Sequence, residues 1–561
     1  MSEPTSVATG SEAARYRKAG WWRDRTYLED FDDAVAAYPD KVAIVGHRQG
    51  QPDPLSVLTY RQLARYVDRF AGALLELGVQ PSQVVSVQLP NEWTFAALTL
   101  ACARIGAVIN PLVPIFRERE LSFILGRTES PVVITTATFR GYDHAAMLDR
   151  VLADLPPGIH GFSVGLDVPD GTFGRVRSFG AHFLERRWEE ETPPQRLQQH
   201  RIGPDQVCEL QFTSGTTGEP KGVMHTPNTL YAGARVFADV VGLTPQDSII
   251  MPSTLAHQTG FLLGIVLPLS RGMKALYQDV WDVDTFCTLV QDEQITFSAG
   301  ATPFLADIVG CCERRDQRLD SMRTYLCAGA PIPSPLVERT LSGVCDNLIA
   351  LWGMTENGGV TLTRIGDPPE LVADSDGTPV DWMEIRVVDP DGQPVGVGEV
   401  GRLLTRGASQ TVGYFKRADL YQEQLTAAED GGAAWFDTGD LARLRPDGGI
   451  RIAGRTKDLV IRGGENIPVV EVEAVLFGHP EVREVAVIGL PDERLGERAC
   501  AVVVPEHPDQ AAALTLAGLV AWCEQAGMAK QFWPERLELI DAFPRTPSGK
   551  IQKFQLRERF Q

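Results

Sequence analysis

The segment from Thr213 to Gly222, Thr-Ser-Gly-Thr-Thr-Gly-Glu-Pro-Lys-Gly, gathers hydroxyls, glycines and one lysine into ten residues. Glycines let the backbone approach an anion closely and turn its N–H groups toward it. The hydroxyls add hydrogen-bond donors, and Lys221 adds a positive charge. This composition favours a loop that holds a polyphosphate, although an exposed flexible turn is the usual structure of a segment rich in Gly, Ser and Thr.

The loop is not of the Walker A type. Lys221 is followed by Gly222 rather than by Ser or Thr, and the glycine spacing also differs. The apolar-rich stretch before the loop, from Val207 to Phe212, has the length and composition of a short buried strand. We therefore expect a phosphate-holding loop that directly follows a strand.

Two carboxylates farther along the chain stand in segments that suit a nucleotide. Glu356 follows Trp352-Gly-Met-Thr, and a carboxylate beside hydroxyls and glycines suits Mg²⁺, which prefers one or two carboxylates plus phosphate oxygens. Asp440 ends Trp435-Phe-Asp-Thr-Gly-Asp, and an acceptor-only carboxylate can take both ribose hydroxyls. On local sequence alone, Asp440 is equally a turn-capping aspartate and Trp352 a core aromatic.

Three other segments carry candidate residues but have ordinary alternatives. His257 lies in Pro252-Ser-Thr-Leu-Ala-His-Gln-Thr-Gly-Phe, beside an apolar run, where a structural histidine is more common than a functional one. The segment Ala328-Gly-Ala-Pro331 by itself indicates only a turn. Lys550 follows a segment rich in Pro, Thr, Ser and Gly that would be a plain tail in most proteins.

The phosphate loop resembles the signature loop of the adenylate-forming enzymes, which include acyl-CoA synthetases, adenylation domains of peptide synthetases and luciferases. Further segments match that superfamily in the order it requires: Leu351-Trp-Gly-Met-Thr-Glu356, Trp435-Phe-Asp-Thr-Gly-Asp440, Gly454-Arg-Thr-Lys-Asp458 and Pro544-Arg-Thr-Pro-Ser-Gly-Lys550. Ordered matches over most of the chain identify it as a member of the superfamily. It is most similar to short- and medium-chain fatty acid and cyclohexanecarboxylate–CoA ligases.

The resemblance implies how ATP would be held. Glu356 would be the magnesium ligand, Thr355 a phosphate contact, and Trp352, where most relatives have tyrosine, the ring stacked on adenine. Asp440 would bind the ribose, and Arg455 would support the ribose or a phosphate. The implied ATP and AMP contacts are Thr213, Ser214, Gly215, Thr216, Thr217, Gly218, Lys221, Gly329, Ala330, Pro331, Trp352, Gly353, Met354, Thr355, Asp440 and Arg455.

Lys550 would be the catalytic lysine of the first half-reaction, with Glu356 and Thr213 as further catalytic residues. The chemistry gives a reason for a lysine. A substrate carboxylate must attack the α-phosphate of ATP, so two anions approach while negative charge develops on phosphorus. A cation placed against both groups offsets their repulsion, and Mg²⁺ screens the leaving pyrophosphate.

The resemblance also implies an acyl pocket, whose wall would consist of small or compact residues: His257, Thr259, Gly260, Gly300, Ala301 and Gly329. No Arg, Lys, Asp or Glu is among them. Because an unpaired buried charge is unfavourable, we expect an apolar monocarboxylate of medium size, alicyclic or short aliphatic, and rejection of dicarboxylates and amino acids. Gly463, Gly464 and Glu465 would meet CoA, and Lys457 would be the hinge position.

Helical and strand patterns alternate from Tyr27 onward, which indicates an α/β architecture with parallel strands. The stretch that opens at Leu58 predicts a helix with a threonine cap. Asp-Gly pairs between β-prone runs indicate hairpins after Gly377, so residues 380–453 should form a smaller β-rich subdomain. Residues 1–25 are expected to form an arm, and residues 166–200 a surface connection.

The expected layout has three parts. A large N-terminal body of mixed α/β subdomains, residues 1–453, includes the β-rich subdomain. A hinge follows at 454–458, and a small mobile α+β C-terminal domain, the lid, covers 459–561. Rotation of the lid about the hinge would let one cavity serve two reactions.

Composition excludes several classes of partner. The formal charge of −20 argues against nucleic acid or an anionic membrane surface, because both need a basic face. Nine cysteines without metal-ligand spacing, and no apolar leader, predict reduced thiols in a cytoplasmic protein. The longest apolar run, Phe261 to Leu269, is too short to span a membrane. The oligomeric state is left open, with a homodimer as one candidate.

We therefore expect an ATP-dependent carboxylic acid–CoA ligase that uses Mg²⁺ and forms acyl-AMP as its intermediate. A stand-alone adenylation enzyme that loads a carrier protein in trans shares every ATP-site motif and remains the alternative. Intact Lys550, Glu356 and Asp440 argue against a non-catalytic binding protein. A P-loop NTPase would release ADP and phosphate instead of AMP and pyrophosphate.

Overall fold

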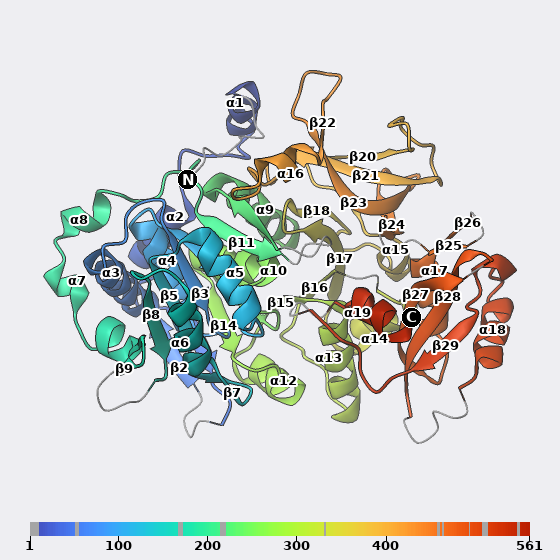
Figure 1. The fold of residues 1–561 in the computed structure, drawn as a ribbon, viewed down its shortest axis with the longest axis horizontal. Coiled ribbons are helices and arrows are strands. Elements are labelled where there is room, and N and C mark those ends of the chain that lie inside the picture. Colours follow the sequence, from blue (N-terminus) through green and yellow to red (C-terminus); the bar gives the residue numbers. More distant parts are fainter. Residues whose placement is uncertain are drawn as a thin grey trace.

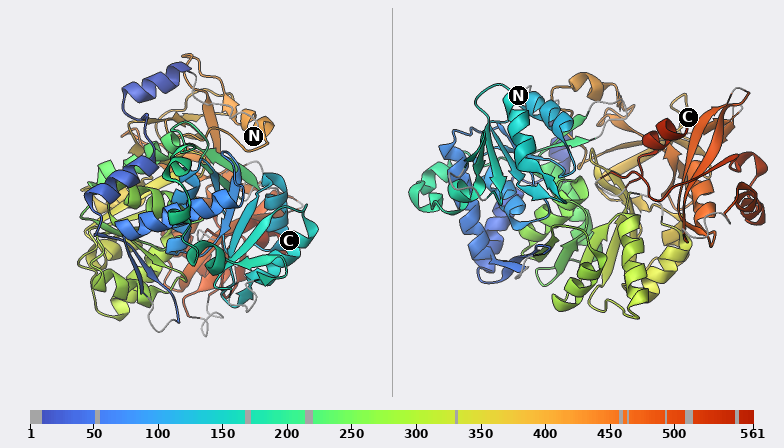
Figure 2. Two further views of the ribbon diagram at one scale, coloured as in Figure 1. Left: turned by 90° about the vertical axis from the view of Figure 1, so that its left-hand side faces the viewer. Right: turned by 60° about the horizontal axis from the view of Figure 1, so that its bottom comes forward.

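The computed structural model describes residues 10–50, 55–166, 172–213, 220–329, 332–456, 460–462, 465–492, 494–507, 514–546 and 550–561. Two large sheets with helices around them form most of a broad body, and a smaller unit from the C-terminal end of the chain lies at one end of it (Figures 1 and 2). The predicted α/β fold, with a large N-terminal body and a small C-terminal domain, is confirmed.

The first large sheet is eight-stranded and mostly parallel. Its strands, in spatial order, are β12 (Lys221–His225), β11 (Glu209–Thr213), β4 (Val108–Pro111), β3 (Val84–Gln88), β5 (Val132–Thr136), β8 (His160–Val164), β10 (Val176–Ser178) and β9 (Thr172–Phe173). Only the two edge strands, β12 and β9, pair antiparallel with their neighbours. The phosphate loop therefore connects an inner strand to an edge strand.

The second large sheet has nine strands. Their order is β19 (Thr378–Pro379), β18 (Gly358–Leu362), β17 (Asn347–Met354), β16 (Thr324–Ala328), β15 (Phe297–Gly300), β13 (Ser248–Met251), β14 (Lys274–Gln278), β1 (Val42–His47) and β2 (Leu55–Thr59). The run from β17 to β1 is parallel. Consecutive strands β15, β16 and β17 therefore end at the same edge of the sheet.

Helices cover both sheets of the body. They are α1 (Gly10–Lys18), α2 (Tyr27–Ala37), α3 (Tyr60–Glu76), α4 (Trp93–Arg104), α5 (Glu118–Thr128), α6 (His144–Asp154), η1 (Gly180–Leu184), α7 (Trp188–Glu191), α8 (Pro194–Gln198), α9 (Pro227–Val241), α10 (Gln258–Gly260), η2 (Phe261–Val266), α11 (Leu267–Arg271), α12 (Val283–Asp292), α13 (Thr302–Arg314), α14 (Ser334–Gly343) and α15 (Pro369–Asp374). A small hairpin, β6 (Thr138–Phe139) with β7 (Tyr142–Asp143), precedes α6.

Helix α3 shows how local sequence specifies these elements. Thr59 accepts a hydrogen bond from the backbone N–H of Gln62, and the Gln62 side chain accepts one from the backbone N–H of Thr59, which completes a capping box. Leu63, Val67 and Phe70 recur at helical spacing and are fully buried. The predicted threonine cap is therefore confirmed, and the buried face packs this helix into the largest hydrophobic core.

The β-rich subdomain forms a five-stranded antiparallel sheet: β20 (Met383–Val388), β21 (Val400–Gly407), β22 (Leu425–Thr426), β23 (Trp435–Leu444) and β24 (Ile450–Arg455), with the short helix α16 (Ala418–Gln422) beside it. The second Asp-Gly turn joins β23 to β24, as the hairpin pattern predicts, and Gly448 takes a φ of +79° there.

The C-terminal unit has a second five-stranded sheet with helices packed on it. Its elements are β25 (Val460–Arg462), β26 (Glu465–Ile467), α17 (Val469–Phe477), β27 (Val482–Asp492), β28 (Gly496–Pro505), α18 (Leu516–Gln525), η4 (Lys530–Phe532), β29 (Arg536–Leu539) and α19 (Lys553–Phe560). This unit lies next to the β-rich sheet, and Arg443 of β23 forms an ion pair with Glu471 of α17 at 2.8 Å (Figure 1).

One sequence expectation about the body was wrong. Residues 166–200 are more than a surface connection, because β9 and β10 extend the eight-stranded sheet and Phe183 and Trp188 are buried. The N-terminal segment is anchored to the body: Tyr16 is buried, and the indole N–H of Trp22 donates to the carbonyl of Ala408 at 2.8 Å. Aromatic side chains contribute to the packing in both segments.

Candidate active site

Strand ends bring the predicted site residues together. β15, β16 and β17 end at Gly300, Ala328 and Met354, and the segment that carries Glu356 follows β17 directly. Ligands of open α/β sheets bind beyond the carboxyl ends of parallel strands. On the other large sheet, Thr213 and Lys221 lie opposite each other in the β11–β12 ladder, so both ends of the phosphate loop are held together.

Asp440 lies at the centre of a polar group. It is opposite Arg455 in the β23–β24 ladder and is almost fully buried. The Arg455 Nε–H donates to its Oδ1 at 3.0 Å, and the indole N–H of Trp352 donates to its Oδ2 at 2.9 Å. The charge of Asp440 is thus paired, while each carboxylate oxygen keeps acceptor capacity of the kind that ribose hydroxyls use.

Glu356 is also buried, but its partner is neutral. The Tyr414 hydroxyl donates to Glu356 Oε1 at 2.9 Å. Burial raises the pKa of the Glu356 carboxyl, and the Tyr414 hydrogen bond, Arg455 and Lys221 oppose that shift. The backbone carbonyl of Glu356 accepts from the Thr411 N–H at 2.6 Å, which fixes the backbone at this point.

Lys550 reaches this group from the C-terminal unit. Its Cε lies 3.0 Å from the position that a Cβ would take at Gly329, whose φ is +92°. Burial, together with the Arg455 charge, lowers the pKa of the Lys550 ammonium to about 8, and Asp440 and Glu356 oppose this shift. The backbone N–H of Lys550 donates to the Thr546 hydroxyl at 3.0 Å.

His257 faces the same space. Burial lowers the pKa of its imidazole to about 4, and the nearby Lys550 charge lowers it as well, so the ring is neutral at neutral pH. Its Nδ1 accepts from the Thr259 N–H at 3.4 Å and caps α10. His257 therefore has the structural role that is common for a buried histidine, and its ring also lies near the Lys550 charge. Its role in an acyl pocket stays a prediction.

Two glycines of the predicted acyl wall are tightly packed. A Cβ at Gly300 would lie 2.6 Å from the Tyr325 hydroxyl, and one at Gly260 would lie 2.0 Å from the Thr254 carbonyl oxygen. A side chain at either position would collide with the protein itself, and the part of these residues in an acyl wall stays a prediction. Ala301 takes the N-cap position of α13 without a side-chain hydrogen bond and is almost fully buried.

The segment around Gly353, which is predicted to contact adenine, is tightly packed. A Cβ at Gly353 would lie 1.9 Å from the Gly358 carbonyl oxygen, so only glycine fits at this point of the antiparallel β17–β18 pair. Met354 packs beside Tyr414. The carbonyl of Thr355 accepts from Nε2 of His225 at 2.7 Å, and His225 is buried with a pKa lowered to about 4 by burial.

Several predicted residues lie outside the described residues, and their roles stay predictions: Ser214, Gly215, Thr216, Thr217, Gly218, Ala330, Pro331, Lys457, Gly463 and Gly464. Glu465 begins β26. Sequence reasoning missed Tyr414 and His225, because a tyrosine or histidine beside apolar residues resembles ordinary core. For His225, the sequence signal was its position four residues after Lys221, close to the predicted phosphate loop.

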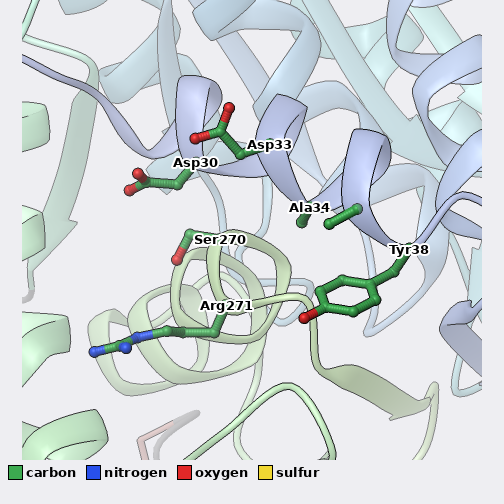
Figure 3. A pocket seen from close by; sticks show the side chains of 7 residues that line it. Asp30, Asp33, Ala34, Tyr38, Ser270 and Arg271 are labelled. Carbon is green, nitrogen blue, oxygen red and sulfur yellow. The ribbon is translucent and has the colours of Figure 1, made fainter.

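A hollow of about 330 Å³ flanks the β11–β12 hairpin and is lined by Phe123, Arg127, Phe212, Pro220, Lys221, Gly222, Phe415, Arg417 and Leu420. Another hollow, of about 220 Å³, lies between α2 and α11 (Figure 3). The charged residues that line this second hollow form ion pairs: Asp30 with Arg23, Asp33 with Arg25, and Arg271 with Asp239. It shares no residue with the predicted site.

One described side chain, that of Glu356, suits a magnesium ion. Glu356 supplies a single buried carboxylate whose charge no described cation pairs directly, and Mg²⁺ is usually bound through one or two carboxylates plus substrate phosphates. The described residues contain no group of three or more His, Cys, Asp or Glu side chains suited to a metal ion.

Comparisons with known proteins decide the family. Residues 31–415 match the family described as AMP-binding enzyme, and residues 471–550 match the AMP-binding enzyme C-terminal domain. The chain belongs to the AMP-binding enzyme family. It is an adenylate-forming ligase of acids, as the ordered motifs predict.

The relatives divide between two acceptors. The chain is 32% identical over 557 residues to a medium-chain fatty-acid–CoA ligase of Escherichia coli, covering 97% of this chain and 92% of the relative. It is 33% identical over 566 residues to a Streptomyces salicylyl-CoA synthase / salicylate adenylyltransferase, covering 100% and 98%. It is 31% identical over 546 residues to a Mycobacterium tuberculosis salicyl-AMP ligase / salicyl-S-ArCP synthetase, covering 96% and 92%.

Solved structures share the fold. The anthranilate CoA ligase AuaEII in complex with anthranoyl-AMP superposes with a TM-score of 0.83 at 23% identity, covering 95% of this chain and 97% of that one. A fatty acyl CoA synthetase of Mycobacterium tuberculosis superposes with a TM-score of 0.69 at 26% identity, covering 95% and 98%. Within the described residues of this enzyme, no helix is both long and apolar enough to cross a membrane.

Proposed function

We propose that this enzyme is an ATP-dependent carboxylic acid–CoA ligase that acts in two steps through acyl-AMP. The observation that carries the proposal is the position of Lys550 against Gly329, within electrostatic reach of Asp440 and Glu356. A lysine from the far end of the chain has no structural need to enter such a site, and burial lowers its pKa.

In the first step, a carboxylate oxygen of the acid attacks the α-phosphorus of ATP, and the bond from that phosphorus to the pyrophosphate oxygen breaks. Lys550, when protonated, lies between the two approaching anions and stabilises the charge that develops. Asp440 and Trp352 position the nucleoside. A bound Mg²⁺, held by Glu356 and the phosphates, would neutralise the phosphate charge.

In the second step, the CoA thiol loses its proton and its sulfur attacks the acyl carbonyl carbon, which releases AMP. Lys550 then has to leave, because the thiol approaches the same carbon that the lysine covers. We propose that the lid, residues 459–561, rotates away from the body, residues 1–453, about a hinge at 454–458, and that Gly463, Gly464 and Glu465 then meet CoA.

The substrate belongs to the proposal as well. The uncharged wall around His257, Thr259 and Ala301 favours a compact apolar monocarboxylate of medium size. Purified enzyme, ATP and Mg²⁺ would be incubated with a panel of medium-chain fatty acids, cyclohexanecarboxylate, salicylate, dicarboxylates and amino acids. We expect pyrophosphate release with apolar monocarboxylates. Efficient use of a free amino acid would contradict this description of the pocket.

A carrier protein is the alternative acceptor, favoured by the 31% identity to a salicyl-AMP ligase / salicyl-S-ArCP synthetase. The acceptor is tested separately by mass spectrometry. The best acid from the panel is supplied with ATP and either CoA or a phosphopantetheinylated carrier protein. Acyl-CoA formation supports the proposal, and acylation of the carrier protein alone would replace it.

A further inference from the structure

The segment from Thr411 to Phe415 connects strand β12 with the backbone of Glu356. The Phe415 N–H donates to the Gly222 carbonyl at 2.7 Å, and Tyr414 forms a β-bridge with Val223. At the start of the segment, the Thr411 N–H donates to the Glu356 carbonyl at 2.6 Å. One short stretch of backbone therefore joins the strand that leaves the phosphate loop to the segment that carries Glu356.

The Tyr414 side chain makes the same connection. It is 4% exposed, and its hydroxyl donates to Glu356 Oε1 at 2.9 Å. The Lys221 ammonium nitrogen lies 5.1 Å from the centroid of its ring, which is within cation–π range. A single tyrosine thus contacts both the lysine of the phosphate loop and the carboxylate that suits a metal ion.

The hydrogen-bond partner of Glu356 is neutral, whereas the Arg455 partner of Asp440 is charged. Asp440 is paired with Arg455, so its negative charge is compensated within the protein. A phenol is neutral, so Tyr414 restricts the orientation of the Glu356 carboxylate and leaves its charge available to a cation. Partners that orient a metal ligand in this way usually alter metal affinity or activity about 10–100-fold when they are removed.

We propose that Tyr414 is a positioning residue: it orients Glu356 toward the magnesium of MgATP and places Lys221 beside the same phosphates. The inference rests on the proposed adenylate-forming reaction and deepens it, because it assigns to the β-rich subdomain a direct part in holding the metal–nucleotide complex.

Tyr421 offers a matched control. It is fully buried, its ring centroid lies 5.5 Å from that of Tyr414, and its hydroxyl donates to the Thr411 carbonyl at 3.1 Å. It does not hydrogen-bond to Glu356 within the described part of the chain. Tyr414→Phe and Tyr421→Phe each remove one buried hydroxyl from the same cluster, and only the first removes a contact to Glu356.

The test measures the Mg²⁺ concentration that gives half-maximal ATP–pyrophosphate exchange. We expect Tyr414→Phe to raise it about tenfold or more, and Tyr421→Phe to leave it unchanged. A second measurement does not depend on turnover: Mn²⁺ binding to the enzyme with a non-hydrolysable ATP analogue, followed by electron paramagnetic resonance. Tyr414→Phe should weaken this binding similarly, and melting of the metal-free variants controls for lost stability.

The outcomes separate the two proposals. A wild-type enzyme that catalyses no acid-dependent exchange would refute the proposed function. A wild-type enzyme that is active, with a Tyr414→Phe variant of unchanged Mg²⁺ and Mn²⁺ affinity, would refute only the role of Tyr414. If Tyr414 acts through Glu356, Glu356→Gln with Tyr414→Phe should have the same metal affinity as Glu356→Gln alone. Additive effects would overturn the inference.

Discussion

At the scale of single residues, the buried charged side chains of this site differ in the groups that compensate their charge. Asp440 and Glu356 are both nearly inaccessible, yet one is paired with a cation and the other with a phenol. Burial and the nearby Arg455 cation both disfavour the charged form of Lys550, so the pKa of its ammonium is lowered. Desolvation of this kind is common where a group must act on a charged substrate.

The titration of Lys550 leads to a prediction about pH. Its pKa is lowered to about 8, so the charged form that stabilises the first step is lost as pH rises through that value. The kcat/KM for acyl-AMP formation should therefore fall above about pH 8. Lys550→Arg, which stays charged, should be slower at neutral pH but should show no such fall. Equal pH profiles for the two enzymes would contradict this role.

Lys550 should also be needed for only one of the two proposed half-reactions. Lys550→Ala should lose at least about 100-fold in acyl-AMP formation, by analogy with the loss of one donor that stabilises a developing charge. Thioester formation from supplied acyl-AMP should stay within a few-fold of wild type, because Lys550 has no part in it.

Another buried carboxyl, that of Glu209, should affect the stability of the fold. Glu209 on β11 is fully buried, both its oxygens lack a hydrogen-bond partner among the described residues, and burial raises its pKa to about 8, with the Gln258 amide opposing. The folded state then binds more protons than the unfolded state between about pH 4.5 and 8, so the free energy of unfolding falls as pH rises through this window.

Glu209→Gln should remove that dependence. The variant should be more stable than wild type at pH 8 by a few kcal/mol at most, since each pKa unit corresponds to ~1.4 kcal/mol. Urea unfolding at several pH values measures the difference. A wild-type slope that the variant retains between pH 5 and 8 would show that other groups cause it.

At the scale of elements, the strand ends position the predicted site residues, and two glycines there have no space for a side chain. β15 ends at Gly300, where an added Cβ would lie 2.6 Å from the hydroxyl of the buried Tyr325. β17 pairs antiparallel with β18, and a Cβ at Gly353 would lie 1.9 Å from the Gly358 carbonyl oxygen. Glycine at these two positions allows the close packing of neighbouring groups.

Gly300→Ala tests this description of the element. Because its Cβ would lie 2.6 Å from the Tyr325 hydroxyl, we expect a loss of about 1–3 kcal/mol in stability from overpacking. The relative turnover of short and long acids should not change. Thermal melting and the acid panel measure the two effects. A selective loss of the largest acid with normal stability would instead place Gly300 in the wall of the acyl pocket.

At the scale of the whole molecule, the position of Lys550 fits one of the two arrangements that the proposed reaction needs. The C-terminal unit delivers the lysine into the body, and Arg443 and Glu471 pair across the boundary between them at 2.8 Å. An exposed pair of this kind contributes little, roughly 0–1 kcal/mol, so it would not prevent rotation of the lid.

Lys457→Pro tests the proposed hinge. Proline fixes φ at that position and restricts Thr456 before it, so the backbone change needed for rotation is blocked. We expect acyl-AMP formation within a few-fold of wild type and a loss of CoA transfer by 100-fold or more, measured separately with ATP–pyrophosphate exchange and with supplied acyl-AMP. Equal losses in both half-reactions would place the hinge elsewhere.

The sequence by itself determined the family, the α/β class and the elements, because motifs, caps and hydrophobic periodicity are local: Thr59 caps α3, and the Asp-Gly turn joins β23 to β24. It also singled out Lys550, Glu356 and Asp440 by their motifs. Only the tertiary structure decided which partners these residues have. Tyr414 is 58 positions from Glu356, and Trp352 is 88 from Asp440. Burial and hydrogen bonding across such separations depend on how the sheets pack, and no local pattern records that.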